Sequence, residues 1–150
     1  MTAAGLVLGG YLGLFLSAFV AATLVPLSSE AVLAALSAAR GFDALALLAV
    51  ATAGNTLGAI VNWGLGRFCL RWEGHRRFPF TRDQLTRAGA RFSRYGQWSL
   101  LFAWLPVIGD PLTFAAGVLG VRILPFTLLV AIGKAARYAA VLAVAMAAAG

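Results

Sequence analysis

Apolar stretches separated by short polar segments alternate along most of the chain. They cover residues 5–25, 27–39, 44–66, 97–105, 112–121 and 124–150. A helix needs about 20 residues to cross the hydrocarbon core of a bilayer. By this measure residues 44–66 and 124–150 are predicted to be full membrane spans, and residues 5–25 are either a span or one arm of a hairpin. The other three stretches are too short to cross.

Prolines stand where the short apolar stretches meet. Pro26 separates the first two stretches, and Pro106 and Pro111 lie between the fourth and the fifth. Proline lacks an N–H and restricts the residue before it, so it breaks a helix. Short helices joined at such breaks predict two re-entrant hairpins. Because broken backbone is tolerated inside a membrane only where it is buried in protein or lines a wet cavity, the breaks also indicate a site.

The composition agrees with an integral membrane protein. Of the 150 residues 61% are hydrophobic and 11% are charged, whereas a soluble domain carries about 25% charged residues. Cys69 and His75 are each the only residue of their type, so we expect neither a metal site nor a cofactor. The chain also lacks the short motifs of hydrolases and nucleotide-binding enzymes, and we expect no enzymatic activity.

Positive charge is concentrated in one segment between the predicted spans. Eight of the twelve basic residues lie between Arg67 and Arg94, together with only two acidic residues. Positive loops beside membrane spans are held on the cytoplasmic side. We therefore place this segment in the cytoplasm and expect no nucleic-acid partner.

The basic segment contains the pattern of an interfacial helix. Thr81 and Gln84 have the spacing of a capping box, and Arg87, Arg91 and Arg94 follow as a stripe on one helical face. Such a helix lies at the membrane surface, where its arginines would contact anionic lipid headgroups. The alternative is a solvated loop that only fixes the orientation of the protein.

The two halves of the chain share a pattern at an offset of 80 residues. Residues 24–30 align with residues 104–110, and both segments read Pro-x-x-x-acid, ending in Glu30 and Asp110. Gly54, which precedes Asn55, follows Glu30 by 24 residues. Gly133, which precedes Lys134, follows Asp110 by 23 residues. Proline-broken segments at matching positions of two halves predict an inverted-repeat transporter whose site lies where the broken elements meet. Chance similarity in Ala/Leu-rich sequence is the alternative.

The predicted fold is an all-α membrane protein with a single membrane domain. Residues 1–66 form the first repeat, residues 67–95 the basic cytoplasmic loop with its amphipathic helix, and residues 96–150 the second repeat. The span at residues 44–66 inverts one proline-broken re-entrant hairpin relative to the other. The first hairpin then opens to the outside and the second to the cytoplasm, with their tips near the midplane.

Four charged residues are predicted to lie inside the membrane. If the last helix begins near residue 125, Lys134 and Arg137 lie roughly 13 and 18 Å along it, and Glu30 and Asp110 stand beside the hairpin breaks. A charge at the centre of a span costs about 2.5–3.5 kcal/mol on insertion scales. Two acids and two bases at similar depth therefore predict a mutually neutralising network that lines the cavity.

Each of these candidates has a structural alternative. Asp110 followed by Pro111 has the pattern of a helix start, and Glu30 resembles an acid in a capped first turn. The two basic side chains are long enough to extend to an interface. Asn55, a further candidate, is also suited to an interhelical hydrogen bond, and Gly54 with Gly58 to a close helix contact.

Several ordered motifs resemble one family of membrane proteins. They are Leu24-Val25-Pro26-x-x-Ser29-Glu30, Gly54-Asn55-x-x-Gly58 through Gly66-Arg67-Phe68, Arg94-Tyr95-Gly96, Trp104-Leu105-Pro106-Val107-Ile108-Gly109-Asp110 with Ala116-Gly117, and Gly133-Lys134-Ala135-x-Arg137-Tyr138. Over nearly the whole chain they are similar to the YqaA branch of the DedA (VTT, SNARE-associated) superfamily. The resemblance implies two facing re-entrant hairpins and transport of lipids, including polyprenyl phosphate carriers, or lipid scrambling, with membrane acids and arginines as functional residues.

One motif departs from the wider superfamily. The segment that reads Leu-Pro-Val-Ile-Gly-Asp here reads Arg-x-Pro-x-x-Arg in many members. Arg137 would then supply the missing charge from another helix. The departure leaves the substrate open and does not change the expected fold.

The sequence thus predicts a small inner-membrane transporter or flippase for an anionic lipid or related amphiphile, of polyprenyl-phosphate or phospholipid type, coupled to protons. Lys134 and Arg137 would bind the anionic head, while Glu30 and Asp110 compete for these cations. Membrane lipids and protons are the expected partners, and a homodimer is compatible with the sequence. The alternative is a non-transporting membrane scaffold or assembly factor. An intramembrane hydrolase that uses Ser28 or Ser29 finds no base in the sequence.

Overall fold

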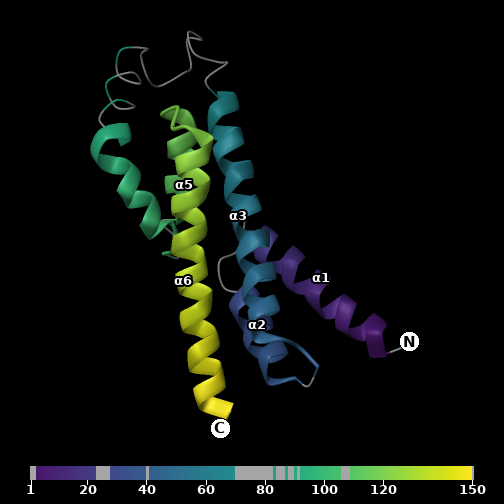
Figure 1. Cartoon of the computed structure of the whole chain (residues 1–150). Coiled ribbons are helices and arrows are strands. Elements are labelled where there is room, and N and C mark those ends of the chain that lie inside the picture. Colours follow the sequence, from purple (N-terminus) through teal and green to yellow (C-terminus); the bar gives the residue numbers. More distant parts are fainter. Residues whose placement is uncertain are drawn as a thin grey trace. The chain divides into compact units, whose positions relative to one another are not determined.

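Helices make up the regular structure of the described part of the chain, which in this computed structural model comprises residues 3–22, 28–39, 41–69, 83, 87, 90, 92–105 and 109–149. In chain order the elements (Figure 1) are α1 (Ala3–Ala21), α2 (Ser28–Ala38), α3 (Ala44–Cys69), the π-helical turn η2 (Phe92–Gly96), the 3-10 helix η3 (Gln97–Trp104), α5 (Gly109–Val118) and α6 (Ile123–Ala149). The predicted all-α class is confirmed.

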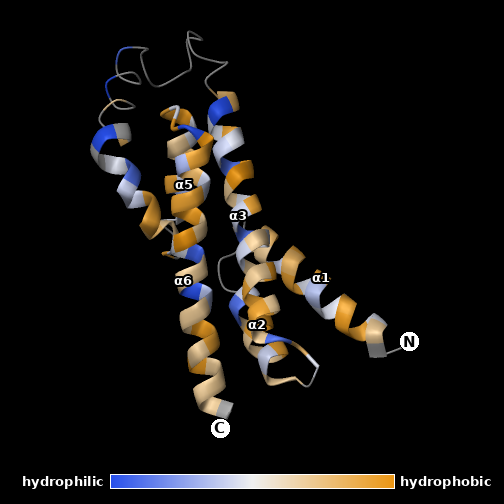
Figure 2. Cartoon of the chain, viewed as in Figure 1, coloured by the Kyte–Doolittle hydropathy of each residue, from blue (hydrophilic) through white to orange (hydrophobic). Residues whose placement is uncertain are grey.

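Three of these helices are long and apolar enough to cross a membrane. The candidate spans are Ala4–Ala21, Ala44–Cys69 and Ile123–Ala148, in α1, α3 and α6. Figure 2 shows that apolar residues predominate along these helices and that polar turns interrupt the middle of α6. By contrast α2, η3 and α5 have 11, 8 and 10 residues. The predicted spans at residues 44–66 and 124–150 are therefore confirmed as long apolar helices.

Large apolar side chains line the outer faces of the three long helices. Exposed members of this set are Leu8, Leu12 and Leu16 on α1, Leu57, Val61 and Leu65 on α3, and Leu124, Leu128 and Ile132 on α6. Within each helix they recur at intervals of four residues, which places them on one face. These faces would be costly in water and contact lipid in a membrane.

The chain divides into two compact units, Met1–Gly58 with Lys134–Gly150 and Ala59–Gly133. The divisions fall inside α3 and α6, so each of these long helices contributes to both units. The repeat boundaries expected from the sequence, after residues 66 and 95, describe a different division and stay a prediction.

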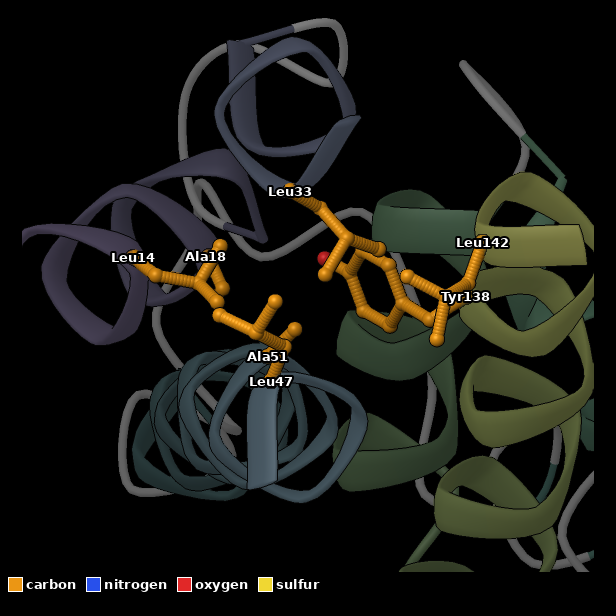
Figure 3. Close-up of a cluster of buried hydrophobic side chains, with 7 residues drawn as sticks. All are labelled: Leu14, Ala18, Leu33, Leu47, Ala51, Tyr138 and Leu142. Carbon is orange, nitrogen blue, oxygen red and sulfur yellow. The ribbon is translucent and has the colours of Figure 1, made fainter. Parts of the chain in front are cut away.

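The core of the first unit joins four helices. Its buried members are Leu14 and Ala18 on α1, Leu33 on α2, Leu47 and Ala51 on α3, and Tyr138 and Leu142 on α6. Figure 3 shows the Tyr138 ring extending from α6 toward Leu33. The pairs on α1, α3 and α6 are each four residues apart, so each helix presents a single face to this core.

Glycines bring α1 and α3 into backbone contact. A Cβ added to Gly54 would lie 2.5 Å from the carbonyl oxygen of Phe15, and one added to Gly58 would lie 2.6 Å from that of Phe19. Neither position tolerates a side chain without displacement of the helix. The close-contact face predicted from Gly54 and Gly58 is confirmed, and it is the packing that small residues permit in membranes.

The turn between α2 and α3 is fastened to the middle of α1. The Asp43 backbone N–H donates to the Tyr11 hydroxyl at 3.1 Å, and the Tyr11 ring meets the edge of Phe42 at 5.3 Å between centroids. The Asp43 side chain caps α3 by accepting from the Ala46 N–H at 2.8 Å. Gly41 has a φ of +97°, a conformation that glycine adopts without strain. The end of α2 is thereby held beside Tyr11.

The second unit has its own core and its own close contacts. The core consists of Ala59, Leu100, Ala103, Ala116, Val121, Phe126 and Val130. The Trp63 indole N–H donates to the Val121 carbonyl at 3.0 Å, which ties α3 to the turn before α6. A Cβ added to Gly133 would lie 2.5 Å from the Leu101 carbonyl oxygen, so α6 and η3 also touch through backbone.

Candidate polar site in the first unit

Three polar side chains project from one side of α6 near its middle. Arg137 and Tyr138 follow Lys134 by three and four residues, a spacing that makes both of them its neighbours on the helix surface. Lys134 lies about 17 Å from the start of α6 and about 22 Å from its end. The predicted mid-span position of the two basic residues follows from these bounds.

Arg137 forms an ion pair with Glu30 in the first turn of α2. The two side chains are 13% and 21% exposed, so the pair is largely shielded by protein. The sequence predicted an acid and a base at this depth, and the structure brings these two together. Removing one member of such a buried pair leaves an uncompensated charge, at a cost of about 3–5 kcal/mol.

Lys134 is held by an amide from α3. Its ammonium donates to Asn55 Oδ1, and Asn55 Nδ2 donates to the carbonyl oxygen of Ala18 at 2.9 Å. Lys134 and Asn55 are 3% and 4% exposed. Ala18 lies in the last turn of α1, where the helix dipole carries partial negative charge. Asn55 thus links the buried cation to the negative end of α1.

A fourth contact joins α2 to α6 beside the ion pair. The hydroxyls of Ser29 and Tyr138 lie 3.0 Å apart, and both residues are 1% exposed. Ser29 was predicted only as a weak nucleophile candidate, and its partner is a phenol. Sequence reasoning assigned no role to Tyr138 beyond the family resemblance. The signal was available, because a buried tyrosine hydroxyl needs a partner.

Asp110 lies in the other unit, in the first turn of α5. Its backbone carbonyl accepts from the Thr113 hydroxyl at 2.8 Å. Pro111 is the third residue of α5. Because proline is tolerated in the first turn of a helix, it does not interrupt α5. The part of Asp110 in the charged network stays a prediction. Pro26 and Pro106, the other two predicted breaks, lie outside the described residues.

The basic stripe is described only in part. Arg87 lies 4.0 Å from Asp83, and their side chains are 83% and 88% exposed, so this pair contributes little to stability. Arg94 is exposed and belongs to η2. Arg91 and the predicted capping box lie outside the described residues. The amphipathic helix and its contacts with headgroups stay predictions.

Among the residues that the structure describes, no three His, Cys, Asp or Glu side chains gather as a metal site requires. What the four contacts offer chemically is two cations, one carboxylate and hydrogen-bonding hydroxyls within apolar helices. Such a set can bind and release an anionic group.

Long apolar helices with a buried charged cluster at mid-span define a multi-pass membrane protein. A family model described as the VTT domain matches residues 25–147, which include every residue of the cluster except Ala18. The chain therefore belongs to the VTT domain family, as the motif resemblance predicted.

Its relatives are bacterial proteins of similar length, and two of them are inner membrane proteins. The chain is 38% identical over 132 residues to the inner membrane protein YqaA of Escherichia coli and to that of Shigella flexneri, and the match covers 87% of each chain. An uncharacterized protein of Haemophilus influenzae is 36% identical over 137 residues, covering 86% of this chain and 83% of the relative. No solved structure matches the chain with significance. With its three apolar helices, the chain is a multi-pass inner-membrane protein.

Proposed function

We propose that this chain is an inner-membrane transporter or flippase for an anionic lipid or related amphiphile, of polyprenyl-phosphate or phospholipid type, with protons as the coupling ion. The observation that carries the proposal is the ion pair of Glu30 and Arg137 beside buried Lys134, at mid-span and next to the first turn of α2. Charged residues inside a membrane are costly, and they typically mark substrate or proton pathways.

The α1–α2 hairpin is proposed to be re-entrant. The turn after α2 is fastened to Tyr11 on α1, and both lie at the start of α3. From there α1 runs along α3 as far as Gly58, against which Ala22 and Phe19 pack. That both helices of the proposed hairpin reach the starting end of α3 supports a re-entrant element, which would be tolerated in a membrane where it is buried in protein.

The inverted repeat is supported by two glycines at matching positions, each of which lies against a backbone carbonyl of another helix. Gly54 touches the Phe15 carbonyl of the preceding hairpin, and Gly133 touches the Leu101 carbonyl of the other hairpin, with the same 2.5 Å closest approach of an added Cβ. Asn55 and Lys134 directly follow these glycines, at matching positions of the proposed repeat, and they form a hydrogen bond with each other.

In the proposed mechanism the anionic head binds to Arg137 and Lys134. While Glu30 is ionised it occupies Arg137, and a proton on Glu30 frees the guanidinium for the substrate. Asp110 is proposed to play the matching part in the second hairpin. Arg87, Arg91 and Arg94 would collect headgroups at the cytoplasmic face.

The test replaces Glu30 and follows transport and stability together. Proteoliposomes that contain the parent protein or Glu30→Gln would be assayed for translocation of a fluorescent phosphatidylglycerol across a range of pH values. We expect Glu30→Gln to change the rate or its pH dependence while the protein still folds. Asp43→Asn is the matched control, because it retains a capping side chain outside the cluster and should translocate like the parent.

A non-transporting scaffold predicts a different result. Parent proteoliposomes would then translocate the lipid no faster than protein-free vesicles. Glu30→Gln would only destabilise the fold, by about 3–5 kcal/mol, because Arg137 would keep a buried charge without its partner. A thermal melt of each variant beside the translocation assay separates the two functions.

A further inference from the structure

Two buried hydroxyls on α3 have no hydrogen-bond partner among the residues that the structure describes. They belong to Thr52 and Thr56, whose Oγ1 atoms are shielded from solvent, and Thr56 as a whole is 7% exposed. A threonine or serine inside a helix usually returns its hydroxyl to a carbonyl one turn earlier. Thr113 and Ser37 do so in this chain, with bonds of 2.8 Å to the Asp110 and Ala34 carbonyls. Thr52 and Thr56 therefore depart from the local pattern.

The two hydroxyls lie on the turn of α3 that carries Asn55. Thr52 and Thr56 are four residues apart and share one helix face, with their Cβ atoms about 5–6 Å from each other. Asn55 lies three residues after Thr52, at neighbour spacing, and its Oδ1 accepts from the Lys134 ammonium. The two donors thus lie within one helical turn of Asn55, the residue that accepts from the buried Lys134 ammonium.

An unpaired buried hydroxyl is destabilising, and such groups in a native protein call for an explanation. Two hydroxyls at this spacing can both donate to one bound oxygen, because each O–H···O contact spans about 2.5–3.0 Å. If that oxygen is also to pair with the neighbouring Lys134 ammonium, it must carry negative charge. A phosphate offers such oxygens, whereas a quaternary ammonium head offers no acceptor.

We propose that Thr52 and Thr56 donate hydrogen bonds to a phosphate oxygen bound beside Lys134 and so select phosphate among possible headgroups. This inference rests on the proposed function, since it adds donors to the same anion site. The chemistry is shared by a lipid phosphate ester and by free phosphate, so both are used as probes.

The experiment measures binding to the full-length protein in dodecyl maltoside micelles, a medium that contains no phosphate. Calorimetric titrations use dodecyl phosphate, inorganic phosphate and, as a head without an acceptor, dodecyltrimethylammonium. Thr52→Val and Thr56→Val remove the hydroxyls and keep the side-chain shape, and Thr→Ser at each position restores the donor. Ser37→Ala is the matched control, because it removes a hydroxyl that already has a carbonyl partner.

We expect each valine variant to weaken phosphate binding about tenfold, with serine variants and Ser37→Ala close to the parent. Without a probe the valine variants should melt at or above the parent temperature, since an unpaired donor has been removed. An effect on dodecyl phosphate alone identifies a lipid headgroup as the source, and an effect on inorganic phosphate alone identifies the free ion. Both results support the inference.

Three outcomes overturn it. If the valine variants bind dodecyl phosphate and inorganic phosphate like the parent, while Arg137→Gln loses binding, the proposed function stands and the threonines hold only water. If the valine variants melt well below the parent without a probe, their hydroxyls are already bonded in the unliganded protein. If the parent binds neither phosphate probe, the inference and the anion site of the proposed function fall together.

Discussion

The hydrogen bond between Ser29 and Tyr138 provides a sharp test of the first unit. Its oxygens are 3.0 Å apart, and both residues are 1% exposed. Tyr138→Phe removes one hydroxyl and keeps the ring that packs among the leucines of the core. Ser29→Ala removes the other hydroxyl from α2. Because both oxygens are buried, Tyr138→Phe leaves the Ser29 hydroxyl without this partner, whereas Ser29→Ala leaves the Tyr138 hydroxyl its side-chain contact with Asn55.

The expected magnitudes follow from that burial. Tyr138→Phe should lose about 1–3 kcal/mol of unfolding free energy, the cost of an unsatisfied buried hydroxyl. Ser29→Ala should lose about 0.5–1.5 kcal/mol, the net value of one hydrogen bond, because the Tyr138 hydroxyl keeps its contact with Asn55. The double variant leaves neither hydroxyl behind, so its loss should fall to about 0.5–1.5 kcal/mol, the net value of one hydrogen bond. The two substitutions should therefore be strongly non-additive. Residues in direct contact typically couple by about 0.5–3 kcal/mol.

Unfolding free energies can be measured by denaturant titration in mixed lipid–detergent micelles for the parent, both single variants and the double variant. Tyr11→Phe serves as the control, because its hydroxyl accepts an exposed N–H that water can satisfy. It should cost less than about 1 kcal/mol and add independently to Ser29→Ala. Additive losses from Tyr138→Phe and Ser29→Ala would refute the contact and its place in the core.

Two further predictions address packing and topology. Gly54→Ala should destabilise the protein, because its Cβ would lie 2.5 Å from a backbone oxygen. Gly64→Ala meets nothing within 4 Å and should raise the free energy of unfolding by about 0.5–1 kcal/mol. Thermal melts of both variants check this, and equal effects would contradict the close helix contact. In a Cys69→Ser background, a cysteine placed beside Arg40 should react with an impermeant thiol reagent from outside, and one beside His75 only from the cytoplasm; labelling of both from one side would refute the inverted repeat.

Much of the fold could be predicted from apolar length alone. A bilayer demands about 20 apolar residues per span, so α3 and α6 were recognisable without tertiary information. The mid-span position of Lys134 and Arg137 followed from counting along one helix. Glu30 was a predictable partner because few acids exist in the apolar part of the chain to balance these bases.

Pairings between distant segments were harder to predict. Ser29 and Tyr138 are 109 residues apart, and only the packing of α2 on α6 brings them together. Asn55 was identified as a polar candidate, but its double role depends on how closely Gly54 lets α1 approach. The same is true of Thr52 and Thr56, which read as ordinary helix residues until their missing partners are seen.

The backbone contact at Gly54 and Gly58 also determines which part of the first unit is free to move. Helices that touch through bare backbone cannot rotate or slide past each other without a clash, so α1 and the adjoining half of α3 form a rigid frame. In contrast, α2 is held to α6 at its first turn by an ion pair and a hydrogen bond. The rest of α2 belongs to the frame, because Leu33 is buried in the core beside Leu14 and the turn after α2 is fastened to Tyr11. Opening the two polar contacts would therefore release only the first turn of α2 from α6.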